Sequence, residues 1–298
     1  MNISYTIRKE DHFKNVKDVL KGYFKISDRL LLKLKNNDKI FLNNSSCSVR
    51  NSVVIDDIVS FSLDFIEDNS NVVPTKMDLN ILYEDEYYMV IDKPSGIAIH
   101  PSHLHFSNSL SNGIKYYFDS IGLKKKVRPV NRLDMDTSGI VIFAKNEYIQ
   151  ECLIKQMNNG LLHKEYIGII NGSFDKDSGT INLPIGRNMN SIIERCVDLN
   201  GSPSITHYQI LNKNTKYSIV KFILETGRTH QIRVHCSYLG HSIVGDTLYG
   251  SSSDLISRQA LHSYKISFVH PITNINVKYI SDSYKLDFVN LISNIKTT

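Results

Sequence analysis

The segment NRLDMDTSGIVIFAK, residues 131–145, decides how most of the chain folds. Residues 139–145 form an almost unbroken apolar run, which predicts a strand buried on both faces. The polar residues before this run would form a loop at the start of the strand. Because a buried strand holds such a loop in a fixed place, the loop can present reactive groups. The same residue types also form ordinary Asx turns, and this segment alone does not separate the two interpretations.

Two carboxylates in this loop, Asp134 and Asp136, are separated by a single residue. Side chains at that spacing point to different sides of a regular backbone, so they do not form an obvious acid–base pair. We therefore expect one carboxylate to be functional and the other to bind the loop or to cap it.

Outward from this strand, the chain combines many short strands with a few helices. Strands are expected at residues 81–92, 164–170, 205–211, 216–226, 260–269 and 275–280, the last two as a hairpin. Helices are expected at residues 109–118, 146–160 and 229–240, the last with Thr229 as its N-cap. Sequential strands joined by short turns predict an α+β domain with a central, mostly antiparallel mixed sheet and flanking helices.

A smaller unit precedes this domain. Ser27 can cap a leucine-rich helix, and residues 39–43 and 58–65 have the composition of strands. The segment IEDNSNVVPTKM, residues 66–77, lacks periodicity, as a linker would. The expected organisation is a small domain at residues 1–66, a linker at 67–77, a larger domain at 78–288 and a C-terminal tail at 289–298.

The charge of the chain is mildly basic. Its 35 Lys and Arg residues against 30 Asp and Glu residues give a net charge of +5, which suits a polyanionic partner. A basic run leads directly into the loop at residue 131: it consists of Lys124, Lys125, Lys126, Arg128 and Arg132. Such a run is either a solvated loop or a phosphate-binding surface.

The cysteines and the apolar stretches indicate the compartment. Cys47, Cys152, Cys196 and Cys236 are scattered and form no CxxC pair, so we expect no metal site and no disulfide framework. The N-terminus does not look like a signal peptide, and no apolar stretch approaches the length of a membrane span. We therefore expect a soluble, cytoplasmic protein with reduced thiols and no contact with membranes.

A second polar segment, TGRTHQIRVH, occupies residues 226–235. Its histidines, His230 and His235, are five residues apart, a spacing that does not place both on one helical face as metal ligands. Single histidines satisfied within the fold, or contacts to phosphates or bases, are the better interpretation. An arginine on this helix can instead hold a carboxylate ionised, because bidentate pairing with arginine favours the charged form.

A third pattern, Lys164-Glu165-Tyr166, opens an expected strand, where a tyrosine is most often a core aromatic. In order along the chain, RLD-x-x-TSG, K-x-Y, TGR-x-HQIR-x-H and LGH-x-IVGD-x-LYG resemble the RluA/RluD-type family of RNA pseudouridine synthases. The resemblance covers residues 78–285. The small N-terminal unit resembles the alpha-L RNA-binding motif that many members of the family carry.

The resemblance implies the pseudouridine synthase fold and an enzyme that isomerises uridine within RNA, without a cofactor or a metal. It implies that Asp134 is the essential catalytic residue, that Arg233 pairs with it, and that Tyr166 stacks on the target base. The carboxylate would attack C1′, add to C6 of the ring or take the C2′ proton, and the sequence does not choose among these steps. The expected RNA contacts are Arg132, Lys124, Lys125, Lys126, Arg128, Arg228 and His230.

The sequence leaves the target of the reaction open. The RNA-binding-like unit favours large-subunit ribosomal RNA, and transfer RNA is the alternative; a non-catalytic RNA-binding ribosome-assembly factor is a further one. We expect a monomer. One position departs from the family: Asn131 replaces the usual histidine before RLD, and an amide cannot act as an acid or base.

Overall fold

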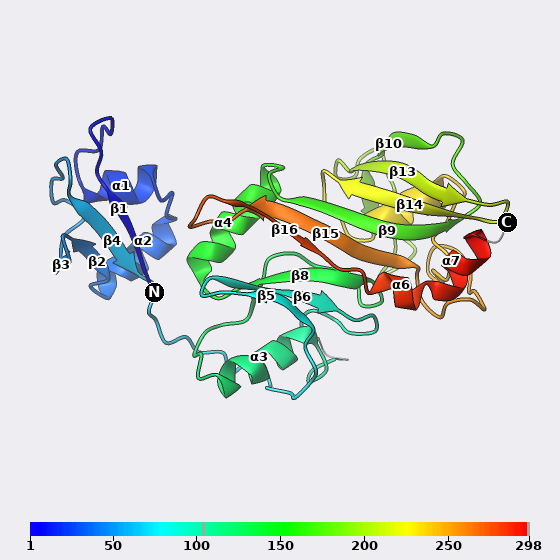
Figure 1. Ribbon diagram of the computed structural model, residues 1–298, viewed down its shortest axis with the longest axis horizontal. Coiled ribbons are helices and arrows are strands. Elements are labelled where there is room, and N and C mark those ends of the chain that lie inside the picture. The colour runs from blue at the N-terminus through cyan, green and yellow to red at the C-terminus, as the bar shows by residue number, and fades with distance from the viewer. Residues whose placement is uncertain (103–104, 297–298) are drawn as a thin grey trace.

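The computed structural model describes residues 1–102 and 105–296, which form a small N-terminal domain and a larger domain built on one long sheet (Figure 1). The strands of the larger domain's main sheet are β5 (Ile81–Glu84), β6 (Tyr88–Lys93), β7 (Arg128–Pro129), β8 (Ser138–Ala144), β9 (His163–Asn171), β10 (Ser178–Asn182), β13 (Ile205–Lys213), β14 (Tyr217–Leu224), β15 (Leu261–Val269) and β16 (Asn276–Ile280). The helices of this domain are α3 (Leu110–Ser120), α4 (Glu147–Asn158), α5 (Gln231–Tyr238), α6 (Tyr284–Asp287) and α7 (Val289–Lys296).

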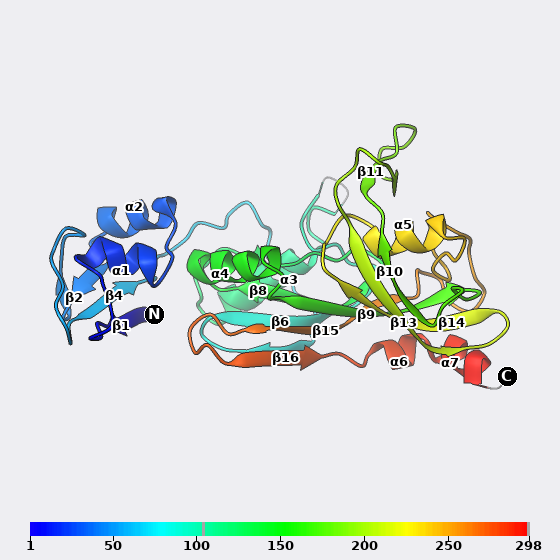
Figure 2. The same ribbon diagram turned by 90° about the horizontal axis from the view of Figure 1, so that it is seen from above.

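The main sheet runs in the order β10-β13-β14-β9-β15-β8-β6-β5, with β16 beside β15 and β7 beside β8. Among the strand pairs that the structure describes, β15 with β8 is parallel and the others are antiparallel. This confirms the expected α+β fold with a mostly antiparallel mixed sheet. Helices α4 and α5 lie on one side of the sheet, and α6 and α7 lie on the other (Figure 2).

The parallel contact between β8 and β15 joins the two halves of the sheet, and it depends on Gly139. Gly139 has a φ of +110°, and a Cβ at this position would lie 2.3 Å from the backbone oxygen of Ser263. A residue with a side chain would therefore push β8 and β15 apart. The glycine that ends the RLD-x-x-TSG pattern is thus required by strand packing, and it fixes where the preceding loop leaves the sheet.

The expected single strand at residues 81–92 is instead a hairpin of β5 and β6. The side chain of Asp85 accepts hydrogen bonds from the backbone nitrogens of Tyr87 and Tyr88 at 2.7 and 2.8 Å, which makes a tight turn between the strands. The acidic residues in the middle of the apolar run were the overlooked signal, because an aspartate that binds the backbone two or three residues on favours a turn.

The C-terminus also differs from the expected tail. Residues 289–296 are helical, and α7 packs against β14. Phe288, Leu291 and Ile295 are almost completely buried. Their spacing of three and four residues is that of one helical face, and burial of this face holds the segment on the sheet.

The N-terminal domain is a small sheet, ordered β1-β4-β2-β3, that packs against two helices (Figure 2). Its elements are β1 (Asn2–Thr6), α1 (Val16–Gly22), α2 (Asp28–Asn36), β2 (Ile40–Leu42), β3 (Ser45–Ser46) and β4 (Ile58–Ser62). Helix α2 begins as expected, with the Ser27 hydroxyl accepting from the backbone nitrogen of Leu30 at 3.3 Å. The sequence did not predict β1 and α1.

The two domains are joined by apolar and ionic contacts as well as by the linker between them. The ring of Phe61 in β4 meets that of Tyr148 in α4 edge-on at 5.3 Å, within a core shared by both domains. Glu67 lies in the segment without helix or strand that follows β4. Its side chain is only 8 % exposed and forms a bidentate pair with Arg128 at 2.7 and 2.8 Å. Lys33 of α2 approaches the same carboxylate at 3.3 Å. The segment therefore anchors one domain to the other.

The pair of Glu67 and Arg128 predicts a pH-dependent stability. Burial alone raises the pKa of Glu67, but the hydrogen bonds and charge of Arg128 outweigh it and hold this pKa below its usual value. A lowered folded-state pKa stabilises the fold above the unfolded pKa of about 4.3, and that contribution is lost as the pH falls through the folded-state value. We expect Glu67→Gln to lower the free energy of unfolding at pH 7 by up to about 3 kcal/mol.

Urea unfolding at a series of pH values measures this effect. The difference between wild type and Glu67→Gln should shrink as the pH falls below about 4.3. Asp282→Asn, which removes one partner of an exposed ion pair with Lys285, is the matched control and should change little. A Glu67→Gln protein as stable as wild type at pH 7 would show that the junction does not depend on this pair.

Candidate active site

A cavity of about 600 Å³ opens where the loop before β8, strand β9 and the N-terminus of α5 meet. Six of the residues singled out from the sequence line it: Asp134, Tyr166, Arg233, Arg132, Arg228 and His230. Three segments separated by about thirty to seventy residues thus converge on one hollow. The second carboxylate of the loop, Asp136, is not among the residues that line it.

The carboxylate of Asp134 is held by a buried arginine. Arg233 donates to Oδ2 of Asp134 at 3.0 Å, and its other nitrogens form a bidentate pair with Asp246 at 2.7 and 2.8 Å. Burial by itself lowers the pKa of Arg233, but the hydrogen bonds to Asp246 and the charges of both carboxylates outweigh it, and this pKa lies above the usual value. Asp246 is completely buried, so the arginine is fixed from behind and its remaining face is directed at Asp134.

A histidine approaches the other oxygen of the same carboxylate. Nε2 of His230 lies 3.8 Å from Oδ1 of Asp134, and its Nδ1 lies 2.8 Å from the hydroxyl of Tyr249. The Tyr249 oxygen already accepts from the backbone nitrogen of Arg195 at 2.8 Å, so its proton is available for Nδ1. The Nε2 nitrogen then carries the ring proton and faces Asp134.

The charge of His230 follows from its surroundings. Burial lowers its pKa most, the charge of Asp134 raises it, and the charges of Arg233 and Arg195 lower it further, with the balance below the usual value. The ring is therefore mostly neutral at pH 7. It offers Asp134 a neutral N–H, and Arg233 remains the cation of the pair.

The loop that carries Asp134 is pinned through its backbone. The carbonyl of Met135 accepts from the buried ammonium of Lys93 at 2.8 Å and from the backbone nitrogen of Gly96 at 3.0 Å. The carbonyl of Asp136 accepts from Arg258 at 3.1 Å. These bonds tie the loop to the turn after β6 and to the start of β15, so that the carboxylate has little freedom to move.

Asn131 also holds this loop, which explains the departure from the family pattern. Its side chain is buried; Nδ2 donates to the carbonyl of Ile140 at 3.0 Å, and Oδ1 accepts from the backbone nitrogen of Ile142 at 2.9 Å. An amide offers a donor and an acceptor in one plane, so it pairs with β8 as a neighbouring strand would. Asn131 thus has a role in positioning the loop that requires no titration.

Tyr166 lies on β9, nearly buried at 6 % exposure, and lines the same cavity. Burial and the negative charge of Asp134 raise its pKa above the usual value of a tyrosine. The phenol therefore keeps its proton at neutral pH. Its aromatic ring and the carboxylate share one hollow, which suits a planar ring bound between them.

The expected N-cap of α5 is different in the structure. His230 occupies the cap position in a left-handed conformation with a φ of +59°, and Thr229 does not cap the helix. No described side chain caps the first turn; the oxygen of Gln231 instead accepts from the backbone nitrogen of Arg228, in the segment before the helix, at 3.0 Å. This conformation turns the imidazole of His230 toward Asp134. His235, five residues on, is a buried structural residue bound to Thr206 and to the carbonyl of Leu183.

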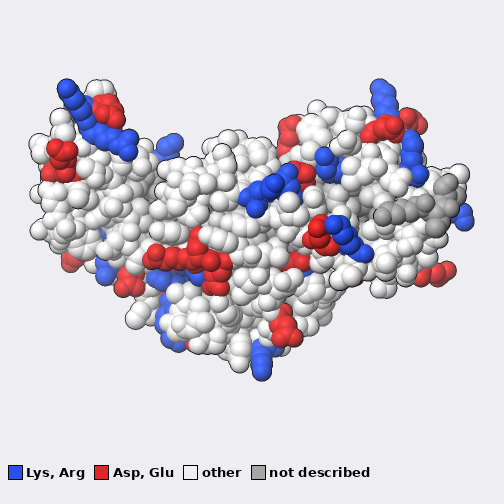
Figure 3. All heavy atoms as spheres, viewed as in Figure 1, with Lys and Arg blue, Asp and Glu red and all other residues white. Residues whose placement is uncertain are grey.

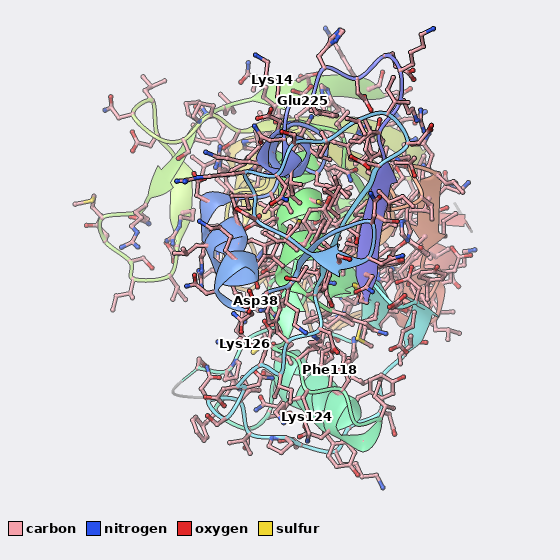
Figure 4. All side chains as sticks on the ribbon, turned by 90° about the vertical axis from the view of Figure 1, so that its left-hand side faces the viewer. Lys14, Asp38, Phe118, Lys124, Lys126 and Glu225 are labelled. Atoms are coloured by element: carbon pink, nitrogen blue, oxygen red, sulfur yellow. The ribbon has the colours of Figure 1, made fainter. Side chains whose placement is uncertain are left out.

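Within the basic run before the loop, Arg132 lines the cavity, and the other four residues form two groups that do not. Arg128 is paired with Glu67, and Lys125 donates to the carbonyls of Leu63 and Phe65, so both hold the domain junction. Lys124 and Lys126 are exposed beside α3, far across the view from Glu225, which lines the cavity (Figure 4).

Charge elsewhere on the surface is dispersed. On the face shown in Figure 3, Lys and Arg alternate with Asp and Glu, and no continuous basic area appears. In the part of the chain that the structure describes, no group of three or more His, Cys, Asp or Glu residues is placed to hold a metal ion. None of the described helices is both long and apolar enough to cross a membrane.

Several residues of the site were missed by sequence reasoning as site residues. Asp246 and Tyr249 lie in the segment LGHSIVGDTLYG, which was matched as a motif without a role for its members. Lys93 lies in the turn KPSG, which was likewise matched as part of a motif without a role for its members. Each motif contained these residues, but only the folded chain shows that they meet Arg233, His230 and the loop that carries Asp134.

Comparison with known proteins agrees with this geometry. Residues 87–238 match the family model described as RNA pseudouridylate synthase. A Bacillus subtilis protein named "Uncharacterized RNA pseudouridine synthase YjbO" is 39 % identical over 259 residues, covering 87 % of this chain and 92 % of its own. The ribosomal large subunit pseudouridine synthase D of Blochmanniella floridana is 31 % identical over 266 residues, 82 % of each chain.

A solved structure extends the comparison. Human RNA Pseudouridylate Synthase Domain Containing 1 superposes with a TM-score of 0.59 at 25 % identity, covering 74 % of this chain and 96 % of that one. The fold and the site define an enzyme that makes pseudouridine in RNA. The chain belongs to the RNA pseudouridylate synthase family and is of its RluA/RluD type.

The buried partner of Arg233 provides the first test of the site. In Asp246→Asn, Arg233 keeps Asp134 as an anionic partner but loses its bidentate pair with the carboxylate at position 246. The guanidinium is then held less firmly beside Asp134. We expect kcat to fall at least about tenfold with little change in KM. Release of tritium from RNA labelled at C5 of uridine measures both constants, and an unchanged kcat would contradict this role for Asp246.

The hydroxyl of Tyr249 provides a second test. Tyr249→Phe keeps the ring, which lies 5.1 Å from Cζ of Arg233, but removes the donor to His230. The substitution also removes the acceptor of the Arg195 backbone nitrogen. Loss of the bond to His230, a neutral hydrogen bond of about 1 kcal/mol, should reduce kcat about fivefold, with RNA affinity unchanged. The same tritium assay and a filter-binding titration measure the two quantities. If both constants matched those of wild type, the orientation of His230 would not matter for the reaction.

Proposed function

We propose that this enzyme isomerises uridines in large-subunit ribosomal RNA and that Asp134 is its catalytic residue. The observation that carries the second part is the pair of Asp134 and Arg233 within the cavity, 3.0 Å apart, with Tyr166 lining the same hollow. A carboxylate that acts as a nucleophile or base must be ionised at pH 7, and a bound base expels the water that would otherwise stabilise its charge. A fixed cation supplies that stabilisation.

The reaction is a rearrangement within one nucleotide. The bond from N1 to C1′ breaks, the uracil rotates, a bond from C5 to C1′ forms, and the proton of C5 is lost as one returns to N1. Each of the three possible first steps, attack at C1′, addition to C6 or removal of the C2′ proton, starts from an ionised carboxylate. In this proposal Arg233 supplies the positive charge beside Asp134, and Tyr166 stacks on the flipped base.

The choice of ribosomal RNA rests on two observations. Relatives that cover most of this chain are named ribosomal large subunit pseudouridine synthase D. The N-terminal domain, with its two helices and small sheet, resembles an RNA-binding motif, and Arg29 and Lys35 of α2 are exposed there. Lys33 does not belong to such a surface, because it pairs with Glu67 and Glu147 at the domain junction.

Contacts to the RNA backbone near the reacting nucleotide are assigned, in this proposal, to Arg132 and Arg228 at the cavity. His230 was expected to join them, but its ring nitrogens face Tyr249 and Asp134. The proposal takes a monomer as the acting form. The four cysteines are free thiols, which fits a reducing, cytoplasmic setting.

Asp134→Asn tests the proposal. Asparagine keeps the shape and most hydrogen bonds of the side chain but cannot act as a nucleophile or base. We expect pseudouridine formation to fall to background while RNA binding persists. The gene is deleted and then complemented with wild type or with Asp134→Asn, and pseudouridine in ribosomal and transfer RNA is mapped by carbodiimide modification.

The outcomes of this experiment separate the alternatives. A site in large-subunit ribosomal RNA that is restored by wild type alone supports the whole proposal. Restoration of a transfer RNA site would replace the target but keep the role of Asp134. Equal restoration by both proteins would remove Asp134 from the mechanism, and a deletion that costs no pseudouridine in either RNA would favour a non-catalytic role in ribosome assembly.

A further inference from the structure

Buried cations in this protein have partners, with one exception. Lys93, Lys164, Arg233 and Arg258 are the lysine and arginine residues that are at least nine-tenths buried among those the structure describes. Lys93 donates to three carbonyl oxygens, Arg233 to two carboxylates, and Arg258 to carbonyls and to Asp287. Lys164 is only 8 % exposed, and its ammonium makes no hydrogen bond or ion pair to any residue in the described part of the chain.

The ammonium of Lys164 lies at the wall of the active-site cavity. It lines that cavity together with residues 226–228, and a Cβ added at Gly227 would lie 2.9 Å from its nitrogen. Because Gly227 has no side chain, the ammonium of Lys164 has room beside the backbone that leads into α5. Lys164 is two residues from Tyr166 on β9, so both side chains lie on one face of the strand, about 7 Å apart along it.

The protein itself supplies no counter-charge for this ammonium within its described residues. The acidic residues that line the cavity are Asp134 and Glu225; the first is paired with Arg233 and the second with His207 at 2.6 Å. Glu165, the neighbour of Lys164 in the chain, pairs with Lys265. Burial accordingly lowers the pKa of Lys164, with no carboxylate to oppose it. The nitrogen of Lys164 is not among the fully buried unpaired atoms of the described chain, because it faces the cavity. An ammonium with so little access to water and no counter-charge is still costly, and a bound anion would relieve that cost.

We propose that Lys164 binds a non-bridging phosphate oxygen of the RNA backbone beside the uridine that enters the cavity. This inference rests on the proposed function, because it names the part of the substrate that this wall of the site receives. The phosphate supplies the missing negative charge and two acceptor oxygens. Bound there, it places the base next to Tyr166 and the ribose within reach of Asp134.

A phosphate suits this position better than a carbonyl of the uracil ring. Lys93 shows how this protein satisfies a buried ammonium with neutral acceptors: it uses three carbonyl oxygens at 2.8 to 2.9 Å. A uracil has two carbonyls on different sides of N3, and they cannot both reach one ammonium. A charged acceptor also forms a hydrogen bond about twice as strong as a neutral one.

The inference predicts opposite effects of one substitution on stability and on binding. Lys164→Met removes an unpaired buried charge and keeps the length of the side chain, so the melting temperature of the free protein should be equal or higher. RNA binding should weaken on the order of 10-fold, and the slope of log Kd against log salt concentration should decrease by about 0.7. A lysine with a purely structural role would lower the melting temperature instead.

The decisive experiment replaces single phosphates. The probe is an RNA fragment containing the uridine identified by carbodiimide mapping, with a neutral methylphosphonate placed at one phosphate at a time on either side of that uridine. With wild type, one position should lose on the order of 10-fold in affinity. With Lys164→Met, replacement at that same position should cause no further loss, while the other positions behave as they do with wild type.

Two controls complete the design. Lys278→Met removes one charge from a residue that does not line the cavity, and it should leave the methylphosphonate profile unchanged. Conversion of the unmodified fragment by wild type shows that the fragment is a substrate; if none occurs, the proposed function fails. If wild type converts it, and no methylphosphonate position distinguishes wild type from Lys164→Met, the phosphate site at Lys164 is overturned.

Discussion

The candidate active site is arranged around one interaction, the pairing of a single buried arginine with two carboxylates. Arg233 meets Asp134 on one side and the fully buried Asp246 on the other. A lone buried arginine would be costly, and a lone buried carboxylate would tend to take up a proton. The two carboxylates and one arginine satisfy each other, and Asp246 stays behind the arginine while Asp134 faces the cavity. Neutral His230 adds a donor without adding a second cation.

The sheet delivers these groups from distant parts of the chain. Strand β8 carries the loop of Asp134, β9 carries Tyr166, and α5 follows β14 with Arg233. The parallel contact of β8 and β15 brings the loop beside the start of β15, and it is possible because Gly139 has no side chain. Buried donors then hold the loop by its carbonyls rather than by its reactive side chain. The backbone of the loop is therefore held in place while the carboxylate of Asp134 stays free to face the cavity.

Positive charge has two separate uses in this protein. The run from Lys124 to Arg128 looks like an RNA-binding surface in sequence, yet Lys125 and Arg128 satisfy carbonyls and a buried carboxylate at the domain junction. Besides Arg233, the lysine and arginine residues at the cavity are Arg132, Arg228 and Lys164, and none of them is paired with a carboxylate among the described residues. A cation that has no partner within the protein can pair with a charged substrate. The presence or absence of such a partner separates the cations at the domain junction from those at the cavity more reliably than their spacing in the chain does.

The sequence by itself determined the kind of fold, the family and the identity of Asp134, Tyr166 and Arg233 as candidates, because strand patterns and ordered motifs are local properties of the chain. It did not show that residues 81–92 turn at Asp85, that the C-terminus is a helix, or that Asn131 binds β8. Those features depend on backbone hydrogen bonds and on burial between segments distant in sequence. The partners of each charge were likewise decided only by tertiary structure: Asp246 behind Arg233, Glu67 against Arg128, and none among the described residues for Lys164. Pairing depends on distance in space, and a linear pattern of residue types does not contain it.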